Sequence, residues 1–60
     1  MYRVETFENG TWVEVFVNVA WDAARNFFWK KRKEKPGVPW RVVKGEMLCG
    51  NYDPKWKIKV

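Results

Sequence analysis

Histidine is absent from this sequence of 60 residues, and cysteine occurs only once. Without histidine the chain lacks the usual general base near neutral pH and the commonest metal ligand, so we expect no nucleophilic triad, no metal site and no cofactor. Cys49 has no partner for an internal disulfide, which favours a reducing, cytoplasmic setting, and its apolar neighbours assign it to the core. Long apolar runs are also missing, since none approaches the roughly 18 residues that span a bilayer. Neither secretion nor membrane insertion is expected.

Small size limits what the chain can do. Sixty residues make a single domain, 1–60, which buries only about 60% of its unfolded surface and leaves little apolar area for a deep substrate pocket. Carboxylate pairs such as Glu5 with Glu14 therefore lack a pocket for acid–base chemistry. The sequence predicts a non-enzymatic protein that acts through its outer surface.

Positive charge is abundant and unevenly distributed. The chain has 12 Lys and Arg residues against 7 Asp and Glu, a formal net charge of +5. Residues 1–24 hold one base and four acids, whereas residues 25–60 hold eleven bases and three acids. A surface with an acidic end and a basic end favours oriented docking on a charged partner.

The N-terminal third predicts a β-hairpin. Asn9-Gly10 is typical of a type I′ turn, and it separates strands at 2–8 and 11–17. A two-residue turn also predicts which residues of the two strands face each other. On the core side the expected pairs are Glu8 with Thr11, Thr6 with Val13, Val4 with Val15 and Tyr2 with Val17.

The other side of this hairpin mixes aromatic and charged side chains. Its candidate contact residues are Arg3, Phe7, Trp12 and Phe16, with Arg3 opposite Phe16. Aromatic sheet faces can stack single-stranded bases. Here, however, Glu5 faces Glu14, a like-charge pair that is unfavourable unless Arg3 or another cation lies between the carboxylates. Because these acids would repel phosphates, we expect this face to meet a protein rather than a nucleic acid.

Residues 19 to about 34 predict a helix, with Asn18 as its N-cap and Pro36-Gly37 ending it. The side chains that should face the sheet form a stripe at helical spacing. They are Ala20, Ala24, Phe27, Phe28 and Lys31. Trp29 lies off this stripe, on the flank of Arg25, Arg32 and Lys33.

The second half of the chain returns to strand patterns. Strands are expected at 40–44 and 47–49 around the turn Gly45-Glu46, followed by a loop at 50–54. Residues 55–60 alternate lysines with apolar residues, as a half-buried edge strand does. The predicted fold is α+β, ββαβββ or ββαββ, with a twisted, mainly antiparallel sheet and one helix packed across a face.

Five tryptophans are unusual in so short a chain. We assign Trp56 and Trp21 to the core, and Trp40 to the start of a strand over the helix end. Trp12 and Trp29 have two interpretations. They either pack in a second layer or form contact surface, because tryptophan is enriched at contact hot spots.

The densest basic segment is Lys30-Lys31-Arg32-Lys33-Glu34-Lys35. One interpretation is a solvated helix end, where positive charge favours the negative pole of the helix dipole. The other is a landing site for phosphates or for an acidic protein surface. The candidate residues are Arg25, Trp29, Lys30, Lys31, Arg32, Lys33 and Lys35, joined by Lys55, Lys57 and Lys59.

Three segments resemble small accessory proteins encoded by bacteriophages. They are Asn9-Gly10-Thr11-Trp12-Val13, Asp22-Ala23-Ala24 and Gly37-Val38-Pro39-Trp40-Arg41-Val42-Val43. Some proteins of that kind take over the host by binding a large bacterial enzyme, notably RNA polymerase, and blocking it without chemistry of their own. The resemblance implies a helix packed on a short antiparallel sheet, with charged surface residues carrying the function.

These features favour a phage-type protein that inhibits or modulates a nucleic-acid machine in the cytoplasm of an infected bacterial host. The expected partner is an acidic protein surface, with RNA polymerase the leading target. Direct binding of DNA or RNA through the basic segment and exposed aromatics is the alternative. A third hypothesis is self-association, which would bury the exposed aromatic side chains of a protein with a marginal core. We therefore expect a monomer or a weak homodimer. No contact with a membrane is expected.

Overall fold

The computed structural model describes residues 1–53 of the chain. They form four strands and one helix, namely β1 (Tyr2–Glu8), β2 (Thr11–Asn18), α1 (Trp21–Glu34), β3 (Trp40–Lys44) and β4 (Met47–Tyr52). The predicted α+β fold is confirmed, with the order ββαββ over this part of the chain. The strand expected at 55–60 lies outside the described residues, together with Trp56, Lys55, Lys57 and Lys59.

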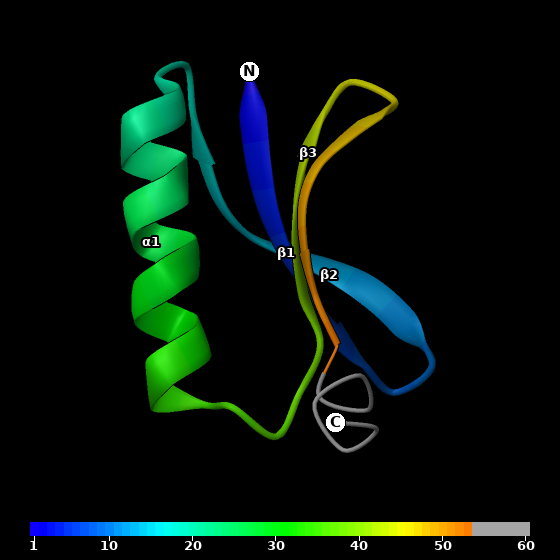
Figure 1. The fold of residues 1–60 in the computed structure, drawn as a ribbon. Coiled ribbons are helices and arrows are strands. Elements are labelled where there is room, and N and C mark those ends of the chain that lie inside the picture. The colour runs from blue at the N-terminus through cyan, green and yellow to red at the C-terminus, as the bar shows by residue number, and fades with distance from the viewer. Residues whose placement is uncertain (54–60) are drawn as a thin grey trace.

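The four strands form one antiparallel sheet in the order β2-β1-β3-β4, and α1 lies along one of its faces (Figure 1). The predicted hairpin turn is present, because Asn9 and Gly10 both have positive φ angles, 54° and 80°. Gly45, with φ 61°, turns the chain from β3 into β4. The end of α1 and the start of β3 lie at one end of the fold, and the turn between β3 and β4 lies at the other (Figure 1).

The register predicted for the hairpin holds only for the half nearer the turn. Glu5 faces Glu14 as expected, but Val4 faces Phe16 instead of Val15. Val15 is therefore an extra residue in β2 and forms a β-bulge. After the bulge, each residue of β2 points to the opposite side of the sheet from the one predicted. The two-residue turn thus determines the register of the residues close to it, but not the register beyond the bulge.

Phe16 turns toward α1 because of this bulge. Its ring stacks on Phe27, with 4.4 Å between the ring centroids and 7° between the planes. Val17 now faces Arg3 and is exposed. Placing Phe16 on the contact face and Val17 in the core was therefore wrong. Stacking on Phe27 buries more apolar area than an exposed position opposite Arg3 would.

The helix begins later than predicted, at Trp21. Ala20 is the N-cap residue and has extended backbone angles, whereas the side-chain Oδ1 of Asn18 accepts a hydrogen bond from the Ala20 N–H at 2.8 Å. Asn18 thus shapes the turn before the helix rather than capping it. Trp21 is 36% exposed and packs on Tyr2, so its assignment to the core was also wrong. The first turn of α1 lies beside the start of β1, not over the middle of the sheet.

The core lies between α1 and the central strands. Its buried members are Val4, Ala24, Phe28, Trp40, Val42 and Tyr52. Trp40 starts β3, as predicted. The loop expected at 50–54 was wrong in its first half, because β4 continues through Gly50 to Tyr52. Pairing with β3 and burial of the Tyr52 ring outweigh the turn preference of these residue types.

Both edges of the sheet carry a bulge. In β4 the pairing shifts between Val42 and Val43 and leaves Cys49 as the extra residue. Its free thiol is half-buried against the core, in line with the core assignment. Bulges twist an edge strand and hinder its pairing with a strand of another molecule. The arrangement favours contacts through faces of this fold over contacts through its edges.

Candidate functional site

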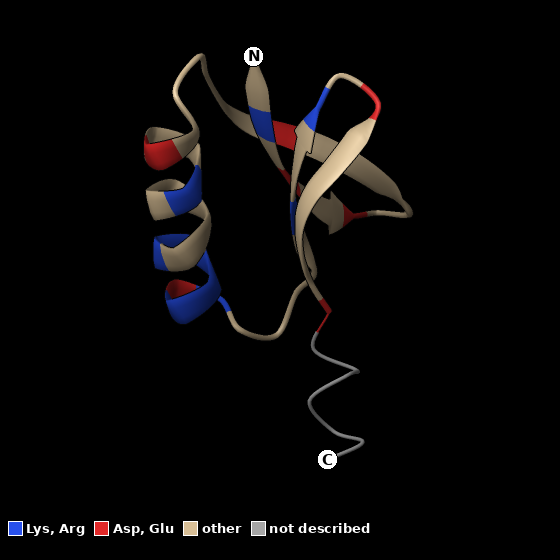
Figure 2. Ribbon diagram, turned by 45° about the horizontal axis from the view of Figure 1, so that its top comes forward, with Lys and Arg blue, Asp and Glu red and all other residues tan. Residues whose placement is uncertain are grey.

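Lys and Arg residues gather on the second half of α1 (Figure 2). The last turn is basic, and Asp22 lies in the first turn, a polarity that suits the helix dipole. We call the cluster the basic helix end. Its members are Lys30, Lys31, Arg32, Lys33 and Lys35. Arg25 is exposed one to two turns before it.

Most of this charge has no ion-pair partner within residues 1–53. Lys31 is the exception, since its Nζ lies 3.1 Å from Oε1 of Glu34. The other cations of α1 and its C-cap have no carboxylate at ion-pair distance in this part of the chain. They are Arg25, Lys30, Arg32, Lys33 and Lys35. Uncompensated cations on one helix produce a local positive potential that attracts an anionic surface.

Two aromatic side chains of the sheet hold the chain just after the helix. The indole Nε1 of Trp40 donates a hydrogen bond to the backbone oxygen of Lys35 at 3.2 Å. The hydroxyl of Tyr52 donates one to the backbone oxygen of Pro36 at 2.8 Å. Both rings are buried, and such bonds are strengthened away from water. The position of the basic helix end is therefore set by β3 and β4.

Trp29 points away from the core, as predicted, and is 49% exposed. The guanidinium carbon of Arg32 lies 4.3 Å from the centroid of the Trp29 ring and 4.5 Å from that of Tyr52. With Lys33 and Pro36 these residues line a shallow hollow of about 210 Å³. Contact with two rings restricts the motion of Arg32 but leaves its charge in place.

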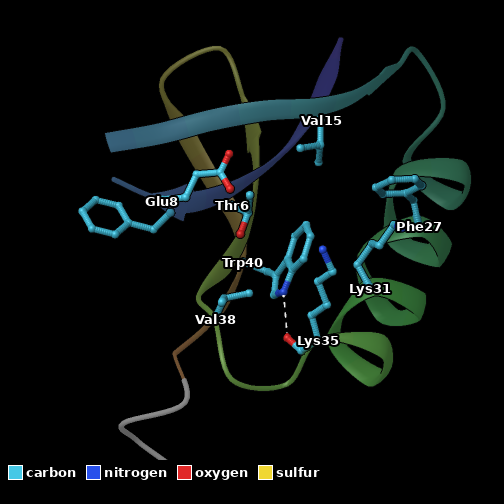
Figure 3. A pocket seen from close by; sticks show the side chains of 9 residues that line it. Thr6, Glu8, Val15, Phe27, Lys31, Lys35, Val38 and Trp40 are labelled. Atoms are coloured by element: carbon cyan, nitrogen blue, oxygen red, sulfur yellow. Dashed lines mark hydrogen bonds between the residues drawn. The ribbon is translucent and has the colours of Figure 1, made fainter. Parts of the chain in front are cut away.

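A larger hollow of about 330 Å³ lies between α1, the end of β1 and the segment that enters β3 (Figure 3). We call it the α1 hollow. Its walls combine apolar side chains, from Val15, Phe27, Val38 and Trp40, with polar ones, and two members of the basic helix end are among the latter. Those two are Lys31 and Lys35. Glu8 lies on the sheet side of the same hollow.

On the sheet face opposite α1, which we call the outer sheet face, Glu5 forms ion pairs with two arginines. Glu5 is only 8% exposed, and its carboxylate accepts hydrogen bonds from Nε of Arg41 at 2.7 Å and from Nε of Arg3 at 3.3 Å. Arg3, one of the cations considered for relieving the repulsion between Glu5 and Glu14, binds Glu5. Arg41 adds a second cation that sequence reasoning did not anticipate.

The aromatic residues of this face also contact each other and Arg41. The guanidinium carbon of Arg41 lies 4.1 Å from the centroid of the Trp12 ring, and Phe7 packs edge-on against Trp12 at 5.3 Å. Phe7 and Trp12 therefore lie together as predicted, whereas Phe16 does not join them. The remaining hollow beside these two rings also involves Pro39.

Sequence reasoning missed Arg41 and Tyr52. The strand pattern at 40–44 places Arg41 on the face opposite Trp40, but its contact with Glu5 depends on pairing between β1 and β3, 36 residues apart in sequence. Tyr52 was assigned to a loop, so its bond to the chain after the helix could not be foreseen. Local pattern carries no information about either contact.

Among residues 1–53, no three His, Cys, Asp or Glu side chains lie close enough together to hold a metal ion. No helix in this range combines the length and apolar character needed to cross a membrane. Comparisons of the chain with models of protein families, with curated proteins and with solved structures found no match.

Proposed function

We propose that this chain is a non-enzymatic binding protein that docks its basic helix end on an acidic surface of a protein complex that handles nucleic acid. Docking there would inhibit or modulate the complex. The observation that carries the proposal is the set of cations on and just after α1 with no carboxylate partner in the described part of the chain. The resemblance to phage accessory proteins makes bacterial RNA polymerase the leading target, in the cytoplasm of an infected host.

The rigidity of the basic helix end supports docking. Because Trp40 and Tyr52 tie down the residues after the helix, little backbone freedom is lost when a partner binds. Trp29 and Arg32 are of the residue types that most often form binding hot spots, and they lie side by side at this end. The outer sheet face offers less, since Glu5 already binds both neighbouring arginines.

Direct binding of single-stranded nucleic acid is the second candidate. It is favoured by the half-exposed ring of Trp29, because aromatic rings beside cations stack bases while the cations contact phosphates. Such binding weakens steeply with salt, by a slope that follows the number of phosphate contacts.

A tagged pull-down from nuclease-treated bacterial lysate, followed by mass spectrometry, separates the two candidates. We expect one stoichiometric protein complex to stay bound after nuclease, and RNA polymerase is the first one to look for. The variant with Lys30, Lys31, Arg32 and Lys33 replaced by Ala should lose it, because four cations leave the contact together. A transcription assay with purified polymerase then measures inhibition by both proteins.

A matched pair of single substitutions controls for net charge. Lys33→Ala removes a cation of the basic helix end, whereas Lys44→Ala removes one at the opposite end of the fold, and only the first should weaken capture. Circular dichroism must show that the quadruple variant is folded. If that folded variant inhibits as well as the parent, the proposed contact is wrong. Loss of every partner after nuclease, with salt-sensitive binding to an oligonucleotide, would favour the second candidate.

A further inference from the structure

We infer that the α1 hollow receives one large apolar side chain from an acidic segment of the protein partner. The inference rests on the proposed function, because it names the chemistry of the segment that meets the basic helix end. The acidic groups of that segment would contact the lysines, and its apolar side chain would fill the space beside them.

The apolar part of the walls, between helix and sheet, favours an apolar side chain. Phe27 and Trp40 present aromatic surface from the helix and the sheet, and Val38 adds aliphatic surface (Figure 3). Val15, the extra residue of the bulge in β2, also lines the hollow and is 42% exposed. A volume of about 330 Å³ is at the small end of ligand sites, and it suits a single side chain better than a whole ligand.

Two of the hydrogen-bond donors in the walls are already engaged, those of Thr6 and Trp40. The hydroxyl of Thr6 donates to the backbone oxygen of Pro39 at 2.9 Å, and the indole N–H of Trp40 donates to Lys35. Neither group is available to donate to the polar edge of a nucleobase between helix and sheet, and unpaired buried polar groups are costly. A leucine or phenylalanine side chain makes no such demand. This contrast favours a protein partner over a nucleic acid at the hollow.

Charge gives the occupant an orientation. Lys31 and Lys35 line the helix side of the hollow, and Lys35 has no ion-pair partner within residues 1–53. Glu8 lies on the sheet side and would repel a carboxylate there. The acidic groups of the partner should therefore lie over the helix, with the apolar side chain pointing between helix and sheet. The same geometry predicts that Glu8→Gln tightens binding, by about twofold to threefold.

The test uses the full chain and two fluorescent synthetic peptides of equal length and equal glutamate content. One carries a single central phenylalanine and the other an alanine, and binding is followed by fluorescence anisotropy. We expect the phenylalanine peptide to bind about tenfold more tightly, because one aromatic side chain is buried. Val15→Phe should remove this preference by filling the hollow. The matched control Val17→Phe adds the same ring to an exposed valine outside the hollow and should leave it unchanged.

A second pair of variants examines the lysines. Lys35→Gln should weaken the phenylalanine peptide more than Lys33→Gln does, although both remove one charge, since Lys33 lines the other hollow. Should Val15→Phe be poorly folded by circular dichroism, Val38→Phe fills the same space from the opposite wall.

Three outcomes would overturn the inference. Equal binding of the two peptides to the parent chain would show that charge alone drives the contact, and the proposed function would survive. A preference for phenylalanine that persists in the folded filling variants would place the apolar side chain elsewhere. Binding of an oligothymidine probe together with no binding of either peptide would overturn the inference and the proposed protein partner together.

Discussion

The helix face and the outer sheet face of this small protein each pair a tryptophan with an arginine, but the two arginines differ in their other contacts. On α1, Trp29 packs with Arg32 at 4.3 Å, and on the outer sheet face Trp12 packs with Arg41 at 4.1 Å. The distances are alike, but Arg41 also binds the carboxylate of Glu5 at 2.7 Å. Arg32 has no such partner within residues 1–53.

This difference separates stabilising charge from charge that can meet a partner. A carboxylate neutralises an arginine, whereas contact with an aromatic ring restrains it and leaves its field intact. The paired charges of the sheet face therefore contribute mainly to stability, whereas the helix face carries the unpaired charge on which the proposed docking depends. Each of the following changes tests that separation.

The largest effect is expected from Glu5→Gln. Glutamine keeps the shape of the side chain but leaves Arg3 and Arg41 without their shared anion in a partly buried site, so the free energy of unfolding should fall by about 2 to 3 kcal/mol. Urea unfolding followed by tryptophan fluorescence measures the loss. Glu34→Gln is the control, since its ion pair with Lys31 is a surface pair worth less than about 0.5 kcal/mol. Similar losses for both variants would contradict the comparison.

Removing the two arginines one at a time sharpens the contrast. Arg41→Gln should destabilise the fold by about 1.5 kcal/mol, because Glu5 loses its shorter ion pair. Arg32→Gln should cost less, about 1 kcal/mol, because each of its contacts with the Trp29 and Tyr52 rings contributes about 0.5 kcal/mol. The order should reverse for partner capture in the pull-down. A larger loss of stability from Arg32→Gln would mean that the helix face is structural.

Tyr52→Phe tests the attachment of the basic helix end to the sheet. It deletes the hydroxyl that donates to Pro36, and about 1 kcal/mol of stability should be lost. Amide hydrogen exchange should also become faster in the last turn of α1, which is no longer held. Tyr2→Phe is the matched control in β1 and should change stability by less than about 0.3 kcal/mol. Unchanged exchange in Tyr52→Phe would show that Trp40 alone holds this end.

The smallest expected effect is the dependence of stability on salt concentration. Because the cations of the basic helix end repel one another, raising the salt concentration from about 20 to about 300 mM should stabilise the parent by a few tenths of a kcal/mol. The variant with Ala at 30–33 should lose this gain, since the repelling charges are gone. Glu5→Gln should retain it. A salt response that is the same in all three proteins would argue against a local cluster.

Much of the fold could be predicted because its signals are local. Asn9-Gly10 sets a turn that requires two positive φ angles, and Pro36-Gly37 follows the last helical residues closely. Trp40 was correctly placed at the start of a strand. The errors arose at Phe16 and Trp21, where packing of α1 on the sheet decides what is buried and no short segment records the outcome.

The candidate site was predictable in composition and not in geometry. The cations of 30–35 and their place at a helix end follow from the sequence, as does the outward direction of Trp29. The α1 hollow could not be foreseen, because the bulge in β2 and the entry into β3 both shape it. Tyr52 joins the site only through strand pairing across the sheet.

By itself, the sequence determined the order of the elements, the hairpin turn and the concentration of positive charge on the second half of one helix. Backbone preference and side-chain periodicity act between neighbouring residues, so a contiguous segment is enough to specify them. Only the tertiary structure decided which charges are paired. The contact of Glu5 with Arg41 joins residues 36 positions apart, and it exists because β1 and β3 pair at the centre of the sheet. Ion pairing depends on distances of a few ångströms, which are set by the packed fold and not by local pattern.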